Sequence, residues 1–147
     1  MTFCLNSIII KPEDGIEIKN AVILLHGYGG DGKDISMLSF NWKRHMPNTV
    51  FICPNGHEVC AINPSGFQWF DLTKDDPDYI LEQSIKAENK IQKFIKGQKI
   101  KKSIFRFYIY LFNFYYVIKT ILPSPSVKIY SAPKAINSAS LLYPFAL

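Results

Sequence analysis

The chain begins with short continuous apolar runs rather than with alternating hydrophobic and polar positions. Ile16 to Leu25 ends in the run Ala-Val-Ile-Leu-Leu, which is typical of a strand buried on both faces of a sheet. Thr49 to Cys53 is a second short apolar strand, closed by a Pro-Asn-Gly turn, and Phe3 to Ile10 is a predicted first strand. Strands of this kind predict an α/β fold with a parallel sheet.

Two segments have helical periodicity and clear start signals. The first helix is expected to follow the glycines after Leu25 and to begin near Asp34 as N-cap. The second has Asp76 as N-cap and Pro77 at its first position, and Gly97 is placed to end it. Its mostly apolar face comprises Ile80, Leu81, Ser84, Ile85, Glu88, Ile91, Phe94 and Ile95. We therefore predict a helix that runs to about Lys96.

A glycine-rich loop follows the strand that ends at Leu25. It reads His26-Gly27-Tyr28-Gly29-Gly30 and then Asp-Gly-Lys. Glycines let the backbone turn sharply and bring its N–H groups close to a ligand, so this loop is a candidate anion site. It lacks the Lys-Ser/Thr ending of a phosphate-binding P-loop and the spacing of a dinucleotide fingerprint, so phosphate binding has no support.

His-Gly-x-Gly directly after such a strand resembles the oxyanion loop of α/β-hydrolases. A second block, Pro64 to Leu72, contains Trp69-Phe70-Asp71 and resembles a segment of the phospholipase/carboxylesterase branch, the relatives of acyl-protein thioesterases. The order of the two motifs, with one helix and one strand between them, fits a βαβ unit. The resemblance covers about Ile18 to Lys96 and implies an incomplete α/β-hydrolase domain with a parallel, doubly wound sheet.

The resemblance also implies roles for individual residues. The backbone N–H of Tyr28 is expected to form part of the oxyanion hole, while His26, Gly27 and Gly29 shape the loop. For His26, a structural role is favoured over that of a catalytic base. Trp69 and Phe70 are candidates for lining the substrate pocket, with packing near the rim of the site as the alternative. The implied substrate is a small ester or thioester.

The residues that would complete the chemistry are missing from the sequence. The branch carries a serine in Gly-x-Ser-x-Gly, followed by an acid and a histidine. Gly97 is the last glycine, no Asp or Glu follows Glu88, and the last histidine is His57. We therefore expect a chain truncated before the nucleophile, without catalytic residues and inactive as it stands.

Charge divides the chain near the same point. Before residue 89, seven Lys and Arg against twelve Asp and Glu give −5, and after it ten Lys and Arg against no acid give +10. We accordingly divide the chain into a hydrolase part, residues 1–97, and an atypical basic, aromatic-rich C-terminal tail, residues 98–147. One explanation of the tail is a frameshift, because A/T-rich DNA read out of frame gives such a composition. Disorder is expected for Pro123 to Leu147.

The other explanation is a functional tail. Ile104 to Ile118 has eight aromatic residues among fifteen, and as a membrane helix it is marginal in length. The alternative function is therefore a non-enzymatic protein that associates with a membrane or a partner through this segment. The lysine spacing forms no recognisable nucleic-acid module, so no nucleic-acid partner is expected.

Three scattered cysteines do not make a disulfide framework. The N-terminus lacks the basic region of a secretory signal, so a cytoplasmic location is expected. Cys53, His57 and Cys60 have a spacing that could bring three soft ligands together, but a fourth partner is missing. We expect no metal and no cofactor.

Overall fold

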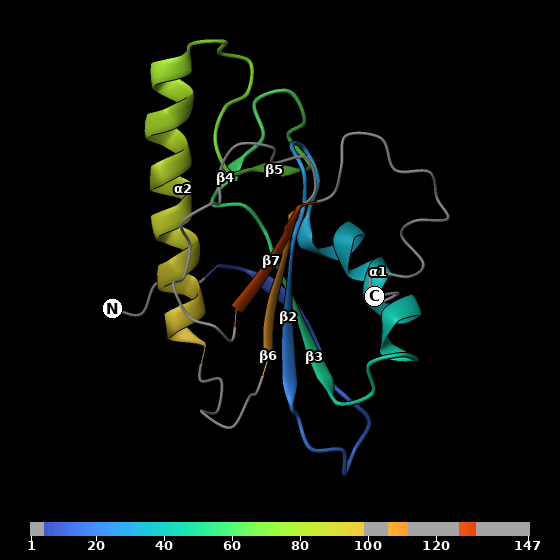
Figure 1. Cartoon of the computed structure of the whole chain (residues 1–147). Helices are drawn as coiled ribbons and strands as arrows, with labels where there is room; N and C mark the ends of the chain where they lie inside the picture. The colour runs from blue at the N-terminus through green and yellow to red at the C-terminus, as the bar shows by residue number, and fades with distance from the viewer. Residues whose placement is uncertain (1–4, 99–105, 112–126, 132–147) are drawn as a thin grey trace.

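The computed structural model describes residues 5–98, 106–111 and 127–131, which form an α/β fold with a five-stranded sheet. Its strands lie in the order β1-β3-β2-β6-β7 (Figure 1). The strands are Ser7–Ile10 (β1), Asn20–Leu25 (β2), Thr49–Pro54 (β3), Arg106–Leu111 (β6) and Val127–Ser131 (β7). A small antiparallel hairpin of Glu58–Val59 (β4) and Phe67–Gln68 (β5) lies beyond one end of the sheet.

Two helices cover opposite faces of this sheet, Gly32–Lys43 (α1) on one side and Pro77–Gly97 (α2) on the other (Figure 1). The side chains of β2 alternate between them. Ala21, Ile23 and Leu25 lie in a cluster with residues of α2, whereas Val22 and Leu24 pack with Trp42 of α1. This double burial explains why β2 is a continuous apolar run.

The predicted βαβ unit is confirmed, because β2 and β3 are parallel and α1 joins them. The sheet as a whole is mixed, since β1 runs antiparallel to β3. Of the described part of the expected first strand, residues 5–10, Ser7–Ile10 is a strand, and β2 begins at Asn20 rather than at Ile16. The segment between them contains a turn in which Ile16 N–H donates to the Glu13 carbonyl at 3.1 Å.

The helix ends test the start signals directly. Asp76 caps α2 as predicted, with its side chain accepting from the N–H groups of Asp78 and Tyr79, and the helix ends at Gly97. The expected N-cap at Asp34 is wrong. Asp31 caps α1 instead, because its Oδ1 accepts from the Asp34 N–H at 2.7 Å, which places Asp34 inside the first turn.

The expectations for the C-terminal segment need correction. Arg106–Leu111 of the aromatic run is not a membrane helix but strand β6, parallel to β2 over its full length; the rest of Ile104–Ile118 lies outside the described residues. Val127–Ser131 is β7, so the expected disorder is wrong for those five residues. The edge of β2 is therefore paired. In the described part of the chain, no helix is long and apolar enough to cross a membrane.

Candidate oxyanion site

The glycine-rich loop begins where β2 ends, and a buried histidine holds its base. His26 is 2% exposed. Gly56 N–H, after β3, donates to His26 Nε2 at 2.8 Å, and His26 Nδ1 lies 2.7 Å from the Gly27 carbonyl oxygen. Nε2 is thus the acceptor and Nδ1–H the donor of a neutral imidazole. The ring links the loops that follow two neighbouring strands.

Burial lowers the pKa of His26, against the opposing influence of its hydrogen bond to Gly27 and of Asp31 and Asp34. Trp69 covers the ring, with the two ring centroids 5.4 Å apart in a stacked arrangement. The Trp69 indole N–H also donates to the His26 carbonyl at 3.0 Å. A histidine with both ring nitrogens engaged in this way acts as a clamp between the two loops.

Residues 27–30 form a tight turn. Gly30 N–H donates to the Gly27 carbonyl at 3.1 Å, and Gly29 has a φ of +75° at the third position. That combination is characteristic of a type II turn, in which a residue with a side chain at the third position is strained. This backbone therefore requires the glycine at position 29.

The two sequence motifs are joined through their backbones. Gly29 N–H donates to the Phe67 carbonyl at 3.0 Å, and Phe67 N–H donates to the Gly30 carbonyl at 2.8 Å. Asn63 Nδ2 donates to the Gly29 carbonyl at 2.8 Å. A Cβ on Gly66 would lie 2.1 Å from the same carbonyl oxygen, so only glycine permits this approach. The segment around Phe67 thus supports the turn from one side.

Tyr28 is the one residue of the turn with a side chain. Its phenol O–H donates to Asp71 Oδ1 at 3.2 Å. Partial burial, together with hydrogen bonds to Cys60 and Asp71, raises the pKa of Tyr28 to about 12. The N–H groups of Gly29 and Gly30 are used within the fold, but no hydrogen bond between described residues uses the Tyr28 N–H. Of the N–H groups of residues 28–30, this is the one that the described part of the chain leaves without an acceptor.

Comparison with known proteins shows the family of the chain. The phospholipase/carboxylesterase family matches residues 6–115 of the chain. The chain belongs to this family. Among solved structures, esterase PE8 is similar at 30% identity with a TM-score of 0.65, over 73% of this chain and 51% of that one. Acyl-protein thioesterase 2 of Zea mays is 20% identical with a TM-score of 0.44, over 71% of this chain and 45% of that one.

The chain therefore spans about half the length of these two relatives. The family match is also wider than the segment from Ile18 to Lys96 in which the sequence shows the resemblance. The expectation that the resemblance stops at Gly97 is wrong, because the match continues through β6. Strands β1 and β6 carry no motif, and their place in the sheet becomes visible only through their pairing with β3 and β2.

The candidate pocket residues Trp69 and Phe70 lie in the core. They are 1% and 4% exposed and belong to a cluster with Ala87, Ile91 and Phe94 of α2. In this position the Trp69 ring stacks on the His26 ring. A pocket-lining role for either residue stays a prediction.

His57 is the second histidine beside the site, and its side chain is only 7% exposed. Its Nε2 lies 3.2 Å from Glu58 Oε1, and its Nδ1 has no hydrogen-bond partner in the described structure. Burial, followed by the charge of Lys90, lowers the pKa of His57. Cys53, His57 and Cys60 do not converge, because no described group of His, Cys, Asp or Glu is arranged to hold a metal ion.

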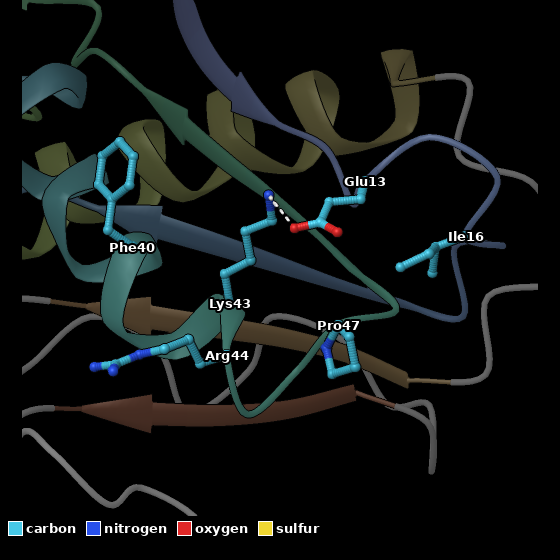
Figure 2. Close-up of a pocket in the computed structure, with 6 residues that line it drawn as sticks. All are labelled: Glu13, Ile16, Phe40, Lys43, Arg44 and Pro47. Atoms are coloured by element: carbon cyan, nitrogen blue, oxygen red, sulfur yellow. Dashed lines mark ion pairs between the residues drawn. The ribbon is translucent and has the colours of Figure 1, made fainter.

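A separate hollow lies away from this site, between the segment before β2 and the end of α1 (Figure 2). It has a volume of about 270 Å³. Its lining residues are Glu13, Ile16, Phe40, Lys43, Arg44 and Pro47. Lys43 Nζ is paired with Glu13 Oε1 at 3.7 Å. The hollow contains none of the residues singled out by the sequence.

Sequence reasoning missed two residues that build the site, Gly56 and Asn63. The signal for Gly56 is the Pro-Asn-Gly turn after β3, which in the sequence indicates only the end of a strand. A Cβ on Gly56 would lie 2.4 Å from the Gln68 carbonyl oxygen, so this turn must carry glycine. Nothing local marks Asn63, whose role depends on a contact with Gly29.

Proposed function

We propose that this chain carries the oxyanion-binding part of a site that acts on small carboxylic esters or thioesters. The observation that carries the proposal is the Tyr28 N–H, which donates to no described residue, in a tight turn at the carboxyl end of β2, where the N–H groups of Gly29 and Gly30 are already used. Ligands of open α/β sheets bind outside the carboxyl ends of the strands. Membership of the phospholipase/carboxylesterase family supports the ester chemistry.

The chemistry of such an N–H group is electrostatic. When a nucleophile attacks an ester carbonyl, negative charge develops on the oxygen, and a fixed donor stabilises that charge more than it stabilises the neutral carbonyl. A donor already held in place needs no reorganisation at that moment. The clamp through His26 and the bonds from Asn63 and Phe67 are what would hold this donor.

A carboxylate probe tests this part of the proposal, because its oxygens resemble the charged oxygen of the intermediate. Titration of the ¹⁵N-labelled protein with octanoate is expected to shift the amide signal of Tyr28. The signals of Gly29 and Gly30 should move less, since those N–H groups donate within the fold. An unmoved Tyr28 signal at saturating octanoate would count against an oxyanion role.

We further propose that residues 1–147 by themselves do not hydrolyse esters. The sequence has no Gly-x-Ser-x-Gly, and both ring nitrogens of His26 are engaged in the fold. The expected result is no turnover of p-nitrophenyl butyrate above background and no labelling by a fluorophosphonate. Turnover together with labelling of one serine would show that the chain contains an unrecognised nucleophile.

The alternative is a non-enzymatic protein that associates with a membrane or a partner through the C-terminal segment. The position of Arg106–Leu111 inside the sheet favours the hydrolase proposal, since this part of the aromatic run already has strand neighbours on both sides. Fractionation with membranes that depends on residues 98–147 would favour the alternative. A cytoplasmic location is part of the main proposal and is supported by the free thiols of Cys53 and Cys60.

A further inference from the structure

The turn at residues 27–30, which carries the Tyr28 N–H, has a flexible backbone. Three of its four residues are glycines, which have the largest conformational freedom of any residue. Tyr28 is therefore the only residue of the turn that can hold it through a side chain of its own. That side chain reaches Asp71, which lies 43 positions further along the chain.

Asp71 is itself held in one orientation. Thr73 donates twice to Asp71 Oδ1, from its hydroxyl at 2.7 Å and from its backbone N–H at 2.9 Å. The same oxygen accepts the Tyr28 phenol. The two bonds from Thr73 lead the causes that lower the pKa of Asp71, so the carboxylate is charged at neutral pH. A charged, fixed acceptor makes a stronger hydrogen bond to the phenol than a neutral one.

The remaining contacts hold the turn at neighbouring points. The Gly27 carbonyl lies in the same peptide unit as the Tyr28 N–H and is bonded to His26 and Gly30, so these bonds also fix the plane of the donor. Asn63 and Phe67 hold Gly29. The Tyr28 side chain itself is held at its phenol, by the bond to Asp71 and by a hydrogen bond with Cys60.

We propose that Asp71, fixed by Thr73, is a positioning residue that orients the Tyr28 N–H toward the oxyanion through the Tyr28 side chain. We call Tyr28, Asp71 and Thr73 the tyrosine latch. This inference rests on the proposed function, because it assigns the latch a purpose only if the Tyr28 N–H binds a charged oxygen. The latch acts on the donor and does not touch the substrate.

Three variants of the full chain test the latch. Asp71→Ala removes the acceptor, Asp71→Asn keeps an Oδ1 acceptor without the charge, and Asp75→Ala is the matched control. Asp75 lies on the same exposed segment and has no hydrogen bond or ion pair shown among the described residues. Each protein is ¹⁵N-labelled, and both octanoate binding and hydrogen exchange of the Gly30 amide are measured by NMR. The Gly30 amide is the reporter because its N–H closes the turn by donating to the Gly27 carbonyl, so its exchange requires the turn to open.

Asp71→Ala is expected to weaken octanoate binding about three- to tenfold, the range for the loss of one hydrogen bond, and to speed exchange of the Gly30 amide. Asp71→Asn should recover most of both properties, and Asp75→Ala should match the unaltered protein. Unchanged binding and exchange in Asp71→Ala would overturn the latch. So would a loss in Asp71→Asn as large as that in Asp71→Ala, because the acceptor oxygen is still present.

The amide exchange separates failure of the latch from failure of the proposed function. If the unaltered protein shows no octanoate response, the oxyanion role fails. Exchange of the Gly30 amide then decides the latch alone. Faster exchange in Asp71→Ala but not in Asp71→Asn supports the tether, and equal exchange in all four proteins rejects it.

Discussion

His26 is neutral because the fold uses both of its ring nitrogens. Protonation of Nε2 would place a second hydrogen against the Gly56 N–H, which already points at that nitrogen from 2.8 Å. Burial also lowers the pKa of His26 below the ordinary value near 6.5, because a charged ring would lose its hydration there. The clamp between the two loops is therefore a device that acid should weaken.

The sign of this pH effect follows from the direction of the shift. Between the lowered pKa of the folded state and 6.5, the unfolded chain binds the proton and the folded chain does not. The free energy of unfolding is thus expected to fall as the pH drops below 6.5, until the pH reaches the pKa of His26 in the folded state. His57, whose pKa burial also lowers, contributes in the same direction.

Urea unfolding at pH 7.5 and pH 5.5 measures the change in stability, and long-range ¹H–¹⁵N NMR of the histidine rings assigns it. The His26 spectrum at pH 7.5 should show an unprotonated Nε2 and a protonated Nδ1. A His26 ring that titrates at or above pH 6.5 would show that the clamp does not exclude the charged form.

The start of α2 gives the second prediction. Asp76 Oδ1 accepts from the Asp78 N–H at 3.0 Å and from the Tyr79 N–H at 3.4 Å, so it satisfies donors that the first helical turn leaves without partners. Asp76→Ala is expected to lower the free energy of unfolding by about 1 kcal/mol. Asp75→Ala is the matched control at the preceding acidic residue and should cost much less. Equal losses in chemical denaturation would point to general charge effects rather than to capping.

The helices and central strands were predictable where their signals are local. The Asp76-Pro77 pair and Gly97 fix both ends of α2, and the apolar runs of β2 and β3 are typical of strands buried on both faces. Local signals did not predict the start of α1, because two nearby residues could each be its N-cap. Asp31 and Asp34 are both good N-caps, and the sequence does not show that the turn at residues 27–30 brings Asp31 into position.

The site was predictable in its motifs but not in its contacts. The sequence gives the glycine loop and the Trp-Phe-Asp block as separate pieces about 40 residues apart. The bonds from Phe67, Asn63 and Asp71 to the turn form only when β3 and the β4–β5 hairpin bring these pieces together. Trp69 shows the same limit, because the sequence could not distinguish a pocket wall from a core residue stacked on His26.

Strand β2 is the central strand of the sheet and connects its parts. It pairs with β3 on one side and with β6 on the other, packs against α1 and α2 on its two faces, and leads into the turn at residues 27–30. The pairing with β6 matters most for interpreting the C-terminal segment. A tail without a structural role would leave that edge of β2 exposed, whereas β6 matches β2 from Asn20 to Leu25.

Ile109→Pro tests whether β6 is part of the folded domain. Ile109 is paired with Ile23 in the middle of this parallel ladder, and proline removes a backbone donor there. We expect a loss of about 3 kcal/mol or more in the free energy of unfolding and faster hydrogen exchange at the β2 amides. Ile109→Val keeps the donor and a β-branched side chain, so it should change the exchange little.

If the β2 amides exchange equally in both variants, the edge of β2 does not depend on β6, and the frameshift explanation of residues 98–147 regains its force. If proline alone releases them, the segment after Gly97 supports the strand that leads into the Tyr28 turn, and a frameshifted tail would have no reason to do so.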